Sequence, residues 1–204
     1  MVDFLKPGTR TFITGKTGSG KSTVAATLLK KSKQRWLIID PKLDDKIASL
    51  KPYRLKRMEA KELYAAWKKG FKYVSITPQA KTGPYEIDEF ILECFESFKD
   101  FGIYVDELYF IHNNGNAGPG LTATLTRGRS DKITFMGATQ RPAFVSLFCI
   151  TEADYIAQFR LALDKDRKRI YEVTGIKQML NNPPAEYSWY YYQVATEDFH
   201  YFVP

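Results

Sequence analysis

Eight residues near the start of the chain have the types and spacing of a phosphate-binding loop. Residues 15–22 read Gly-Lys-Thr-Gly-Ser-Gly-Lys-Ser, which fits the Walker A pattern G-x-x-x-x-G-K-[ST]. Glycine lacks a Cβ, so Gly15, Gly18 and Gly20 allow successive backbone N–H groups to face one anion. Lys21 is expected to reach the β- and γ-phosphates of a triphosphate, and the Ser22 hydroxyl to bind Mg²⁺. The predicted cofactors are therefore ATP and Mg²⁺.

The residues predicted to bind the nucleotide are Gly15, Lys16, Thr17, Gly18, Ser19, Gly20, Lys21, Ser22 and Thr23.

Two consecutive carboxylates follow an apolar run further along the chain. Residues 102–107 read Gly-Ile-Tyr-Val-Asp-Glu, as expected of a buried strand whose carboxyl end opens onto the ligand-binding edge of a parallel sheet. Asp106 is predicted to hold the Mg²⁺ shell. Glu107 is predicted to accept a proton from the water that attacks the γ-phosphate, or to orient that water. Such a pair is common by itself, but together with the loop it favours hydrolysis over transfer to an organic acceptor.

The segments around these residues predict alternating strands and helices. β-rich or apolar runs predict strands at 10–14, 36–42, 53–55, 71–76, 102–107, 133–139 and 154–163. Apolar residues at helical spacing predict helices at 22–31, 60–69, 86–99, 121–129, 164–173 and 176–182. This alternation predicts an α/β fold with a mainly parallel sheet covered on both faces. Residues 188–194 and 199–203 predict a C-terminal β-hairpin.

One polar, glycine-rich segment, 112–120, is predicted to be a mobile surface loop. His112 is interpreted as a residue of that loop and not as a ligand. The two cysteines, Cys94 and Cys149, form neither a disulfide framework nor a metal pattern. They are interpreted as buried thiols, although pairing between them stays open.

Composition is that of an ordinary globular protein. The chain has 204 residues, of which 44% are hydrophobic and 26% charged, and its net charge is +7. That charge is compatible with a polyanionic partner, although each basic cluster can equally be a solvated helix face. The longest apolar run, 143–150, is too short to cross a bilayer, and the N-terminus has no signal-peptide pattern. We therefore expect an intracellular protein without a membrane span, forming a single ATPase domain over 1–204.

A family resemblance is carried by residues after the Asp-Glu strand. Gly128-Arg129-Ser130, followed by Ile133 to Pro142 with its Ala-Thr-Gln-Arg-Pro end, resembles the corresponding stretch of FtsK–HerA superfamily DNA-translocating ATPases. Asp40-Pro41-Lys42 also resembles members of that group. The short chain is most similar to genome-packaging ATPases of tailless icosahedral double-stranded DNA viruses with internal membranes. Among these it closely resembles the packaging NTPases of archaeal turreted icosahedral viruses, over roughly residues 9–175.

The resemblance implies a fold and further site residues. The fold would be a RecA-like P-loop NTPase of the ASCE type, with the strand ending at Gln140 inserted between the phosphate-loop strand and the Asp106 strand. Gln140 would then lie beside the γ-phosphate. Ring-forming relatives complete each site with a neighbour's arginine, for which Arg129 is the best match and Arg127 the reserve; such a finger is worth about 10³ to 10⁵ in turnover. Arg141, which precedes a proline, is open to a structural interpretation.

The implied function is an ATP-hydrolysing motor that translocates double-stranded viral DNA into a preformed capsid. Contacts to DNA would be to phosphates and independent of sequence, with 112–120 and 165–169 as the first candidates. The resemblance also implies self-association into a ring, a hexamer or pentamer, and partners among capsid or membrane vertex proteins. The expected location is the host cytoplasm during assembly, at the packaging vertex of the virion.

Other functions remain open on sequence grounds. A cellular-type DNA translocase or helicase would share every motif. A small P-loop kinase would need an acceptor pocket and would not need Glu107 to activate water. A nucleotide-gated switch would hydrolyse only as a timer, and no guanine-reading Asn-Lys-x-Asp segment is present.

Overall fold

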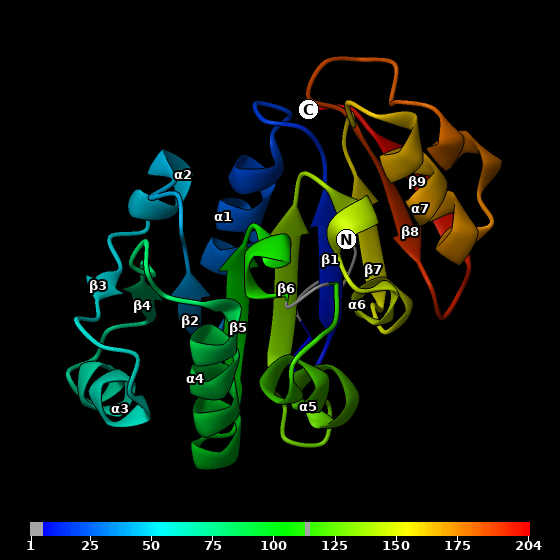
Figure 1. The fold of residues 1–204 in the computed structure, drawn as a ribbon. Coiled ribbons are helices and arrows are strands. Elements are labelled where there is room, and N and C mark those ends of the chain that lie inside the picture. The colour runs from blue at the N-terminus through cyan, green and yellow to red at the C-terminus, as the bar shows by residue number, and fades with distance from the viewer. Residues whose placement is uncertain (1–5, 113–114) are drawn as a thin grey trace.

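The computed structural model describes residues 6–112 and 115–204. Its centre is a nine-stranded sheet in the order β3-β4-β2-β5-β6-β1-β7-β8-β9 (Figure 1). The strands are β1 Arg10–Thr14, β2 Arg35–Ile39, β3 Tyr53–Arg54, β4 Tyr73–Ile76, β5 Phe101–Asp106, β6 Thr134–Thr139, β7 Tyr155–Gln158, β8 Trp189–Gln193 and β9 Asp198–Phe202. The α-helices are α1 Lys21–Lys31, α2 Asp45–Ala48, α3 Ala60–Lys68, α4 Pro84–Ser97, α5 Pro119–Arg127, α6 Leu147–Thr151 and α7 Asp164–Thr174.

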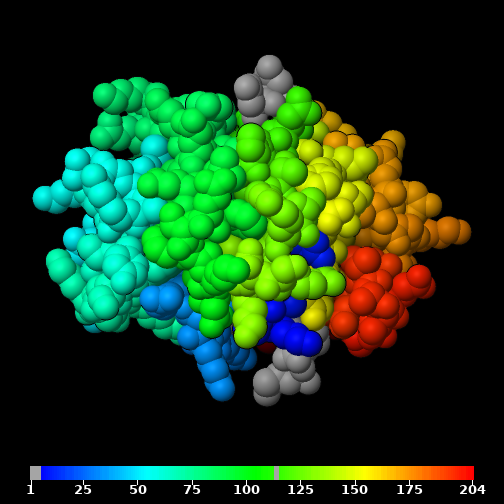
Figure 2. Space-filling model, turned by 90° about the horizontal axis from the view of Figure 1, so that it is seen from below, coloured from blue at the N-terminus to red at the C-terminus, as the bar shows by residue number. Residues whose placement is uncertain are grey.

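The sheet is parallel from β3 through β7, and β8 and β9 are antiparallel to their neighbours. This confirms the mainly parallel sheet and the C-terminal hairpin. Strand β6 pairs with β1 on one side and β5 on the other, so the predicted insertion is also present. Seen from below, blue residues near the start of β1 emerge between yellow-green residues before β6 and the red hairpin, as that order requires (Figure 2).

Helices cover both faces of the sheet because successive strand residues point to opposite sides. On β1, for example, Phe12 joins the core beneath α3 to α7, whereas Ile13 joins the core beneath α1 and α2. In Figure 1, α4 and α5 lie in front of the sheet. The predicted core face of the helix expected at 86–99 is confirmed, since Ile87, Phe90 and Ile91 are buried there. Within the described part of the chain, no helix has the length and apolarity needed to cross a membrane.

The segment 112–120 differs from the predicted surface loop, although residues 113 and 114 lie outside the described residues. His112 is buried, its Nδ1 lies 2.7 Å from the Leu108 carbonyl oxygen, and its Nε2 lies 3.4 Å from Cys149 Sγ. At the other end, α5 begins at Pro119, and the buried Asp88 carboxylate of α4 accepts hydrogen bonds from the first N–H groups of α5. The glycine-rich composition did not indicate a helix start here. The N–H groups at the start of α5 are capped by a side chain of another helix, so they do not need a capping residue in the segment itself.

Several boundaries also differ from the predictions. Strand β7 ends at Gln158 although apolar residues continue to Leu163, and the helix expected at 176–182 is a short 3₁₀ helix over 177–180. The prediction of buried thiols is confirmed: Cys94 and Cys149 are both free and buried.

The C-terminal hairpin extends the sheet behind the phosphate-binding loop. Phe159, just after β7, stacks on Trp189 of β8 with ring centroids 5.3 Å apart, and Trp189 stacks on Phe202 of β9 at 5.3 Å. These aromatic rings of the hairpin therefore serve as packing residues.

Candidate nucleotide site

The phosphate-binding loop connects β1 to α1 and is held at a fixed distance from the neighbouring strands. Gly15 N–H donates to the Thr139 carbonyl at 3.2 Å, and Lys16 N–H donates to the Arg160 carbonyl at 2.7 Å. A Cβ on Gly15 would lie 2.5 Å from Phe159 Cβ, and Gly20 has φ = 102°. Both positions therefore require glycine, one for space and the other for a left-handed backbone.

Two side chains of the loop are arranged for an anion. Lys21 is buried, and its Nζ donates to the Lys16 carbonyl oxygen at 3.0 Å. Burial lowers the pKa of Lys21, while the nearby Glu107 and Asp106 carboxylates oppose that shift. Ser19 Oγ is buried and has no hydrogen-bond partner among the described residues. A polyphosphate in the loop would provide acceptors for both groups.

Asp106 ends β5 at the same edge of the sheet. It is 5% exposed, and Tyr104 O–H donates to its Oδ1 at 2.9 Å. Burial raises the pKa of Asp106 to about 6, with the Tyr104 hydrogen bond and Lys42 acting in the opposite direction. A carboxylate desolvated in this way gains from a bound cation.

Glu107 lies just beyond the strand, with a left-handed backbone at φ = 70°. Its carboxylate is 2% exposed. One oxygen, Oε1, accepts from Thr139 Oγ1 at 2.9 Å and from Gln140 N–H at 3.1 Å. The other, Oε2, forms an ion pair with Lys42 Nζ. Donors at or just after the ends of both neighbouring strands, β2 and β6, thus fix the side chain that is predicted to activate water.

Gln140 connects the carboxylate to the phosphate-binding loop. Its backbone N–H contacts Glu107, as above, and its side-chain Oε1 accepts from Thr17 Oγ1 at 2.7 Å. Because β6 lies between β5 and β1, these three segments meet at one edge. The structure therefore brings together Lys21, Asp106, Glu107 and Gln140, residues far apart in the sequence.

The oxygen groups at this edge fit a magnesium ion. Ser22 lies in the first turn of α1 and is partly exposed, and Asp106 supplies a carboxylate. Mg²⁺ is usually held by one or two such protein oxygens together with substrate phosphates and water. The described residues contain no cluster of three or more His, Cys, Asp or Glu arranged as a metal site.

Comparison with known proteins identifies the group to which this site belongs. The chain is 30% identical over 164 residues to the DNA packaging ATPase P9 of Enterobacteria phage PRD1, covering 79% of this chain and 68% of that protein. This chain belongs to the viral DNA packaging ATPases. No protein-family model matches it.

Solved structures confirm the fold of this packaging ATPase. The genome packaging NTPase B204 from Sulfolobus turreted icosahedral virus 2, in complex with AMPPCP, gives a TM-score of 0.78 at 17% identity and covers 97% of this chain and 98% of that one. The DNA-packaging ATPase B204 from Sulfolobus turreted icosahedral virus gives 0.77 at 18% identity, covering 98% and 99%. The conjugation coupling protein TcpA of pCW3 gives 0.58 at 19% identity, covering 98% of this chain and 61% of that one. The predicted fold, that of the viral packaging NTPases, is confirmed.

The two candidate finger arginines of the packaging ATPase lie at the opposite end of the sheet from its phosphate-binding loop. Arg129 Nη2 lies 2.5 Å from Oδ1 of Asp154, which precedes β7 and also pairs with Arg10 at the start of β1. Arg127 has its guanidinium 5.0 Å from the centre of the Phe95 ring. Neither arginine is brought to the loop of its own chain.

Sequence reasoning missed two side chains that hold the packaging ATPase site together. Lys42 was noted only as part of a family resemblance, yet it pairs with Glu107. Asp166, fully buried at the start of α7, accepts from Arg141 Nε at 3.2 Å and from Ala143 N–H at 3.1 Å. These contacts support the structural interpretation of Arg141. The available signal was that Lys42 and Arg141 each closely follow a buried strand.

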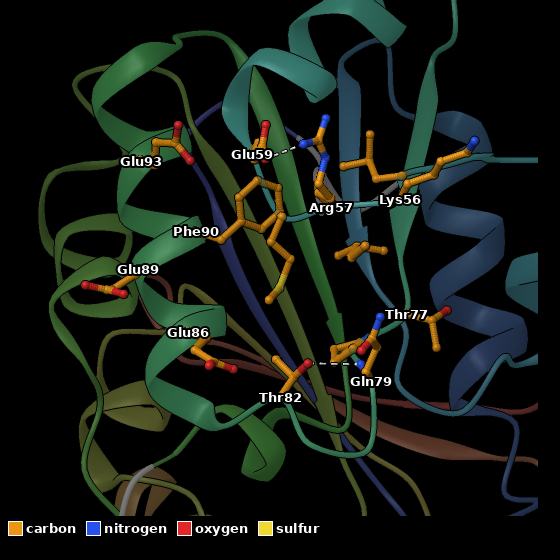
Figure 3. A pocket seen from close by; sticks show the side chains of 14 residues that line it. Lys56, Arg57, Glu59, Thr77, Gln79, Thr82, Glu86, Glu89, Phe90 and Glu93 are labelled. Carbon is orange, nitrogen blue, oxygen red and sulfur yellow. Dashed lines mark hydrogen bonds and ion pairs between the residues drawn. The ribbon is translucent and has the colours of Figure 1, made fainter.

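A hollow of about 820 Å³ lies elsewhere on the packaging ATPase, beside α4 and the residues that follow β3 and β4 (Figure 3). Figure 3 shows Glu86, Glu89 and Glu93 spaced along α4. Glu86 accepts from Gly83 N–H at 3.0 Å, and Glu93 accepts from Ala60 N–H at 3.1 Å. Glu86 and Glu93 thus cap the starts of α4 and α3, so their positions have a structural explanation.

Proposed function

We propose that this packaging ATPase hydrolyses ATP with Mg²⁺ and uses the cycle to move double-stranded viral DNA into a preformed capsid, with residues 1–204 acting as one domain. The observation that supports hydrolysis best is the meeting of the phosphate-binding loop, Asp106-Glu107 and Gln140 at the ends of adjacent strands. The relative from phage PRD1, described as a DNA packaging ATPase, supports DNA packaging as the process that hydrolysis drives.

In this proposal each side chain has a distinct role around the γ-phosphate. Lys21 leaves the Lys16 carbonyl and binds the β- and γ-phosphate oxygens. Ser22 and Asp106 hold a Mg²⁺ that screens the phosphate charge. Glu107 orients the attacking water and takes its proton as the new P–O bond forms and the bond to the β-phosphate oxygen breaks. Gln140, linked to both Thr17 and Glu107, responds to the presence of the γ-phosphate.

Completion of the site is proposed to come from a second copy of the chain. Arg129 lies far from its own loop, which suits a residue that acts in trans within a ring, hexameric or pentameric. Its side chain is 65% exposed, and exposed ion pairs such as that with Asp154 are weak, about 0–1 kcal/mol. A neighbour's γ-phosphate can therefore compete for it.

A hollow of about 540 Å³ is the proposed first contact for DNA. It is lined by Tyr109, Gly115, Ala143, Phe144, Val145 and Arg169. It thus joins the two segments nominated from the sequence, 112–120 and 165–169. Cations surround its aromatic wall: Arg141 Cζ lies 4.6 Å and Lys165 Nζ 4.5 Å from the centre of the Phe144 ring. Cations at such a surface suit phosphate contacts that do not depend on base sequence.

The proposed place of action is the packaging vertex of the assembling virion in the host cytoplasm, where capsid or membrane vertex proteins would hold the ring. A test is to measure ATP turnover against protein concentration, with and without duplex DNA. A motor ring should show a rate per chain that rises with concentration and rises again with DNA. A rate indifferent to both would contradict the motor and favour a nucleotide-gated switch.

Mixing two inactive variants tests the arginine in trans. Lys21→Ala chains should fail to bind nucleotide, and Arg129→Ala chains should bind it but turn over slowly. In a mixture, Lys21→Ala chains still donate Arg129 to neighbours with an intact loop, so activity should reappear. The matched control is a mixture of Arg127→Ala with Lys21→Ala chains. If the mixture of Arg129→Ala with Lys21→Ala chains stayed inactive, the proposed finger would be excluded.

Hydrolysis is separated from phosphoryl transfer by Glu107→Gln. The variant should lose turnover by about 10² to 10⁴ because the general base is removed, while ATP binding persists. Turnover by the wild-type chain that required an added organic acceptor would instead indicate a kinase.

A further inference from the structure

We propose that Lys42 is a positioning residue for ATP hydrolysis and that it acts by holding the Glu107 carboxylate toward the attacking water. The inference rests on the proposed hydrolysis and adds a residue to it. It is carried by the contacts around Glu107, by the way the Lys42 backbone is fixed, and by the charges near both.

Glu107 is held from both neighbouring strands. Strand β5 lies between β2 and β6, and Ile39 at the end of β2 is in register with Val105. Lys42 therefore approaches Glu107 from the β2 side, while Thr139 and Gln140 approach from the β6 side. A carboxylate fixed in this way keeps one orientation through the reaction, which is how enzymes reduce the reorganisation needed at the transition state.

The backbone of Lys42 is itself anchored. Asp40, 4% exposed, accepts from Lys42 N–H at 3.2 Å and from Asp44 N–H at 3.0 Å. Asp44 in turn caps α2 by accepting from Lys46 N–H at 2.8 Å. Burial raises the pKa of Asp40, and these backbone hydrogen bonds oppose that shift. These hydrogen bonds thus fix the backbone position from which the Lys42 side chain extends to Glu107.

Lys42 is the cation in direct contact with Glu107 among the described residues. The other cation nearby, Lys21, donates to Lys16 instead and is assigned to the phosphates. Asp106, Asp40 and Asp44 add negative charge to this region. Without Lys42, only the Thr139 and Gln140 contacts to Oε1 would hold Glu107 against repulsion from these carboxylates, because like charges repel.

The contacts leave one acceptor site of Glu107 for a water molecule. A carboxylate has about four acceptor sites, and Thr139, Gln140 and Lys42 use three of those on Glu107. The remaining site is on Oε2, the oxygen that Lys42 orients. The Lys42 side chain is 41% exposed and that of Glu107 is 2% exposed, so Lys42 lies between the carboxylate and solvent.

The test compares Lys42→Met, which keeps the stem and removes the charge, with Lys42→Arg and with Lys46→Met as a matched control on the same turn and helix. For Lys42→Met we expect kcat to fall by about 10- to 100-fold, as for misplacement of a catalytic group, with KM and the Kd for ATP unchanged. Lys42→Arg should restore part of kcat, and Lys46→Met should behave as wild type.

A double-mutant cycle in single-turnover assays shows whether Lys42 acts through Glu107. Adding Lys42→Met to Glu107→Gln should slow the reaction no further, since residues acting as a unit are non-additive. An equal loss in both backgrounds would overturn the proposal, as would a rise in Kd for ATP at unchanged kcat, which would make Lys42 a phosphate contact. Thermal unfolding of each variant detects a merely structural effect: a kcat loss matched by the same loss of folded protein would also overturn it.

The same assay separates this inference from the proposed function. A wild-type chain without turnover would refute hydrolysis itself, and with it this role of Lys42. A wild-type chain that turns over ATP but is indifferent to Lys42→Met would refute only the role of Lys42.

Discussion

Asp106 shows how a functional side chain opposes folding stability. It is almost fully buried at the end of β5, and its main neutral partner is the Tyr104 hydroxyl. Its pKa is raised from 3.8 to about 6 because burial penalises the charged form. The native chain therefore binds this proton more tightly than the unfolded chain does. The site retains a carboxylate there because a cation, and not the protein alone, is its proposed partner.

The first prediction concerns stability against pH in the absence of nucleotide. With the folded pKa above the unfolded one, the contribution of Asp106 is most favourable below about pH 4, weakens as pH rises from 4 to 6, and stays unfavourable above 6. Asp106→Asn removes the charge, so at pH 7.5 it should be more stable than wild type by about 1–3 kcal/mol. Urea unfolding at pH 7.5 and pH 4 measures this.

The difference between the variant and wild type should shrink to about 0.5 kcal/mol at pH 4. Asp106→Asn should also lose Mg²⁺-dependent turnover, so stability and activity change in opposite directions. A variant less stable than wild type at both pH values would show that the carboxylate is stabilised by protein contacts alone.

At the scale of elements, the sequence predicted the parts of the site better than their arrangement. The phosphate-binding loop was recognisable because its glycines and its lysine are contiguous. The strands on either side of Glu107 were not, because strand order depends on long-range pairing, and the order came only from family resemblance. The contacts of Lys42 and Asp166 could not be predicted for the same reason: their partners, Glu107 and Arg141, are remote in the chain.

Arg141 and Asp166 link the end of β6 to the start of α7. Gln140 precedes Arg141, and Ala143 follows it in a short 3₁₀ helix that Asp166 also holds. A shift of Gln140 on loss of the γ-phosphate would thus be transmitted to α7 and to the proposed DNA-contact hollow. Packed elements transmit such shifts when they have two discrete arrangements.

The second prediction tests this link with Asp166→Ala. Removing the buried carboxylate leaves the Ala143 N–H without its acceptor, so unfolding free energy should fall by about 1–3 kcal/mol. Stimulation of ATP turnover by DNA should fall more than basal turnover. The control is Asp164→Ala on the same helix, whose 81% exposed side chain should change stability by about 0.5 kcal/mol or less.

Urea unfolding and steady-state rates with and without DNA distinguish the outcomes. If Asp166→Ala lowered stability but left the stimulation ratio intact, α7 would not connect the nucleotide to the DNA.

The two ends of the molecule carry different functional residues. The residues of the nucleotide site lie at one end of the sheet, and Arg129 lies at the other. Head-to-tail contacts between identical chains join such unlike ends, and they close into a ring when the rotation between neighbours allows. The net charge of +7 then concerns the partner and not the fold, because it favours association with a polyanion.

The third prediction concerns salt. Binding to duplex DNA should weaken as salt rises, and each lysine or arginine that contacts a phosphate should contribute about 0.9 to the slope of log K against log salt. Lys165→Met and Arg169→Met should each lower the slope by about that amount, equally for different DNA sequences. The control, Lys61→Met, makes the same charge change on α3, at the other edge of the sheet, where Lys61 pairs with Glu59.

Fluorescence anisotropy of labelled duplexes over a salt series measures these slopes. If the slope of log K against log salt were the same for Lys165→Met, Arg169→Met and Lys61→Met, the hollow would not be the DNA contact.

The ring stack of Phe159, Trp189 and Phe202 has a practical consequence. On one side, Phe159 packs close to the backbone of Gly15 and Gly20. On the other side, it stacks on the indole of Trp189. Any movement of the glycines on binding a ligand is therefore passed to a natural fluorophore. The intrinsic emission of Trp189 should thus report occupancy in real time, without a dye, and Trp189→Phe, which retains Trp36 and Trp67, supplies the reference to subtract.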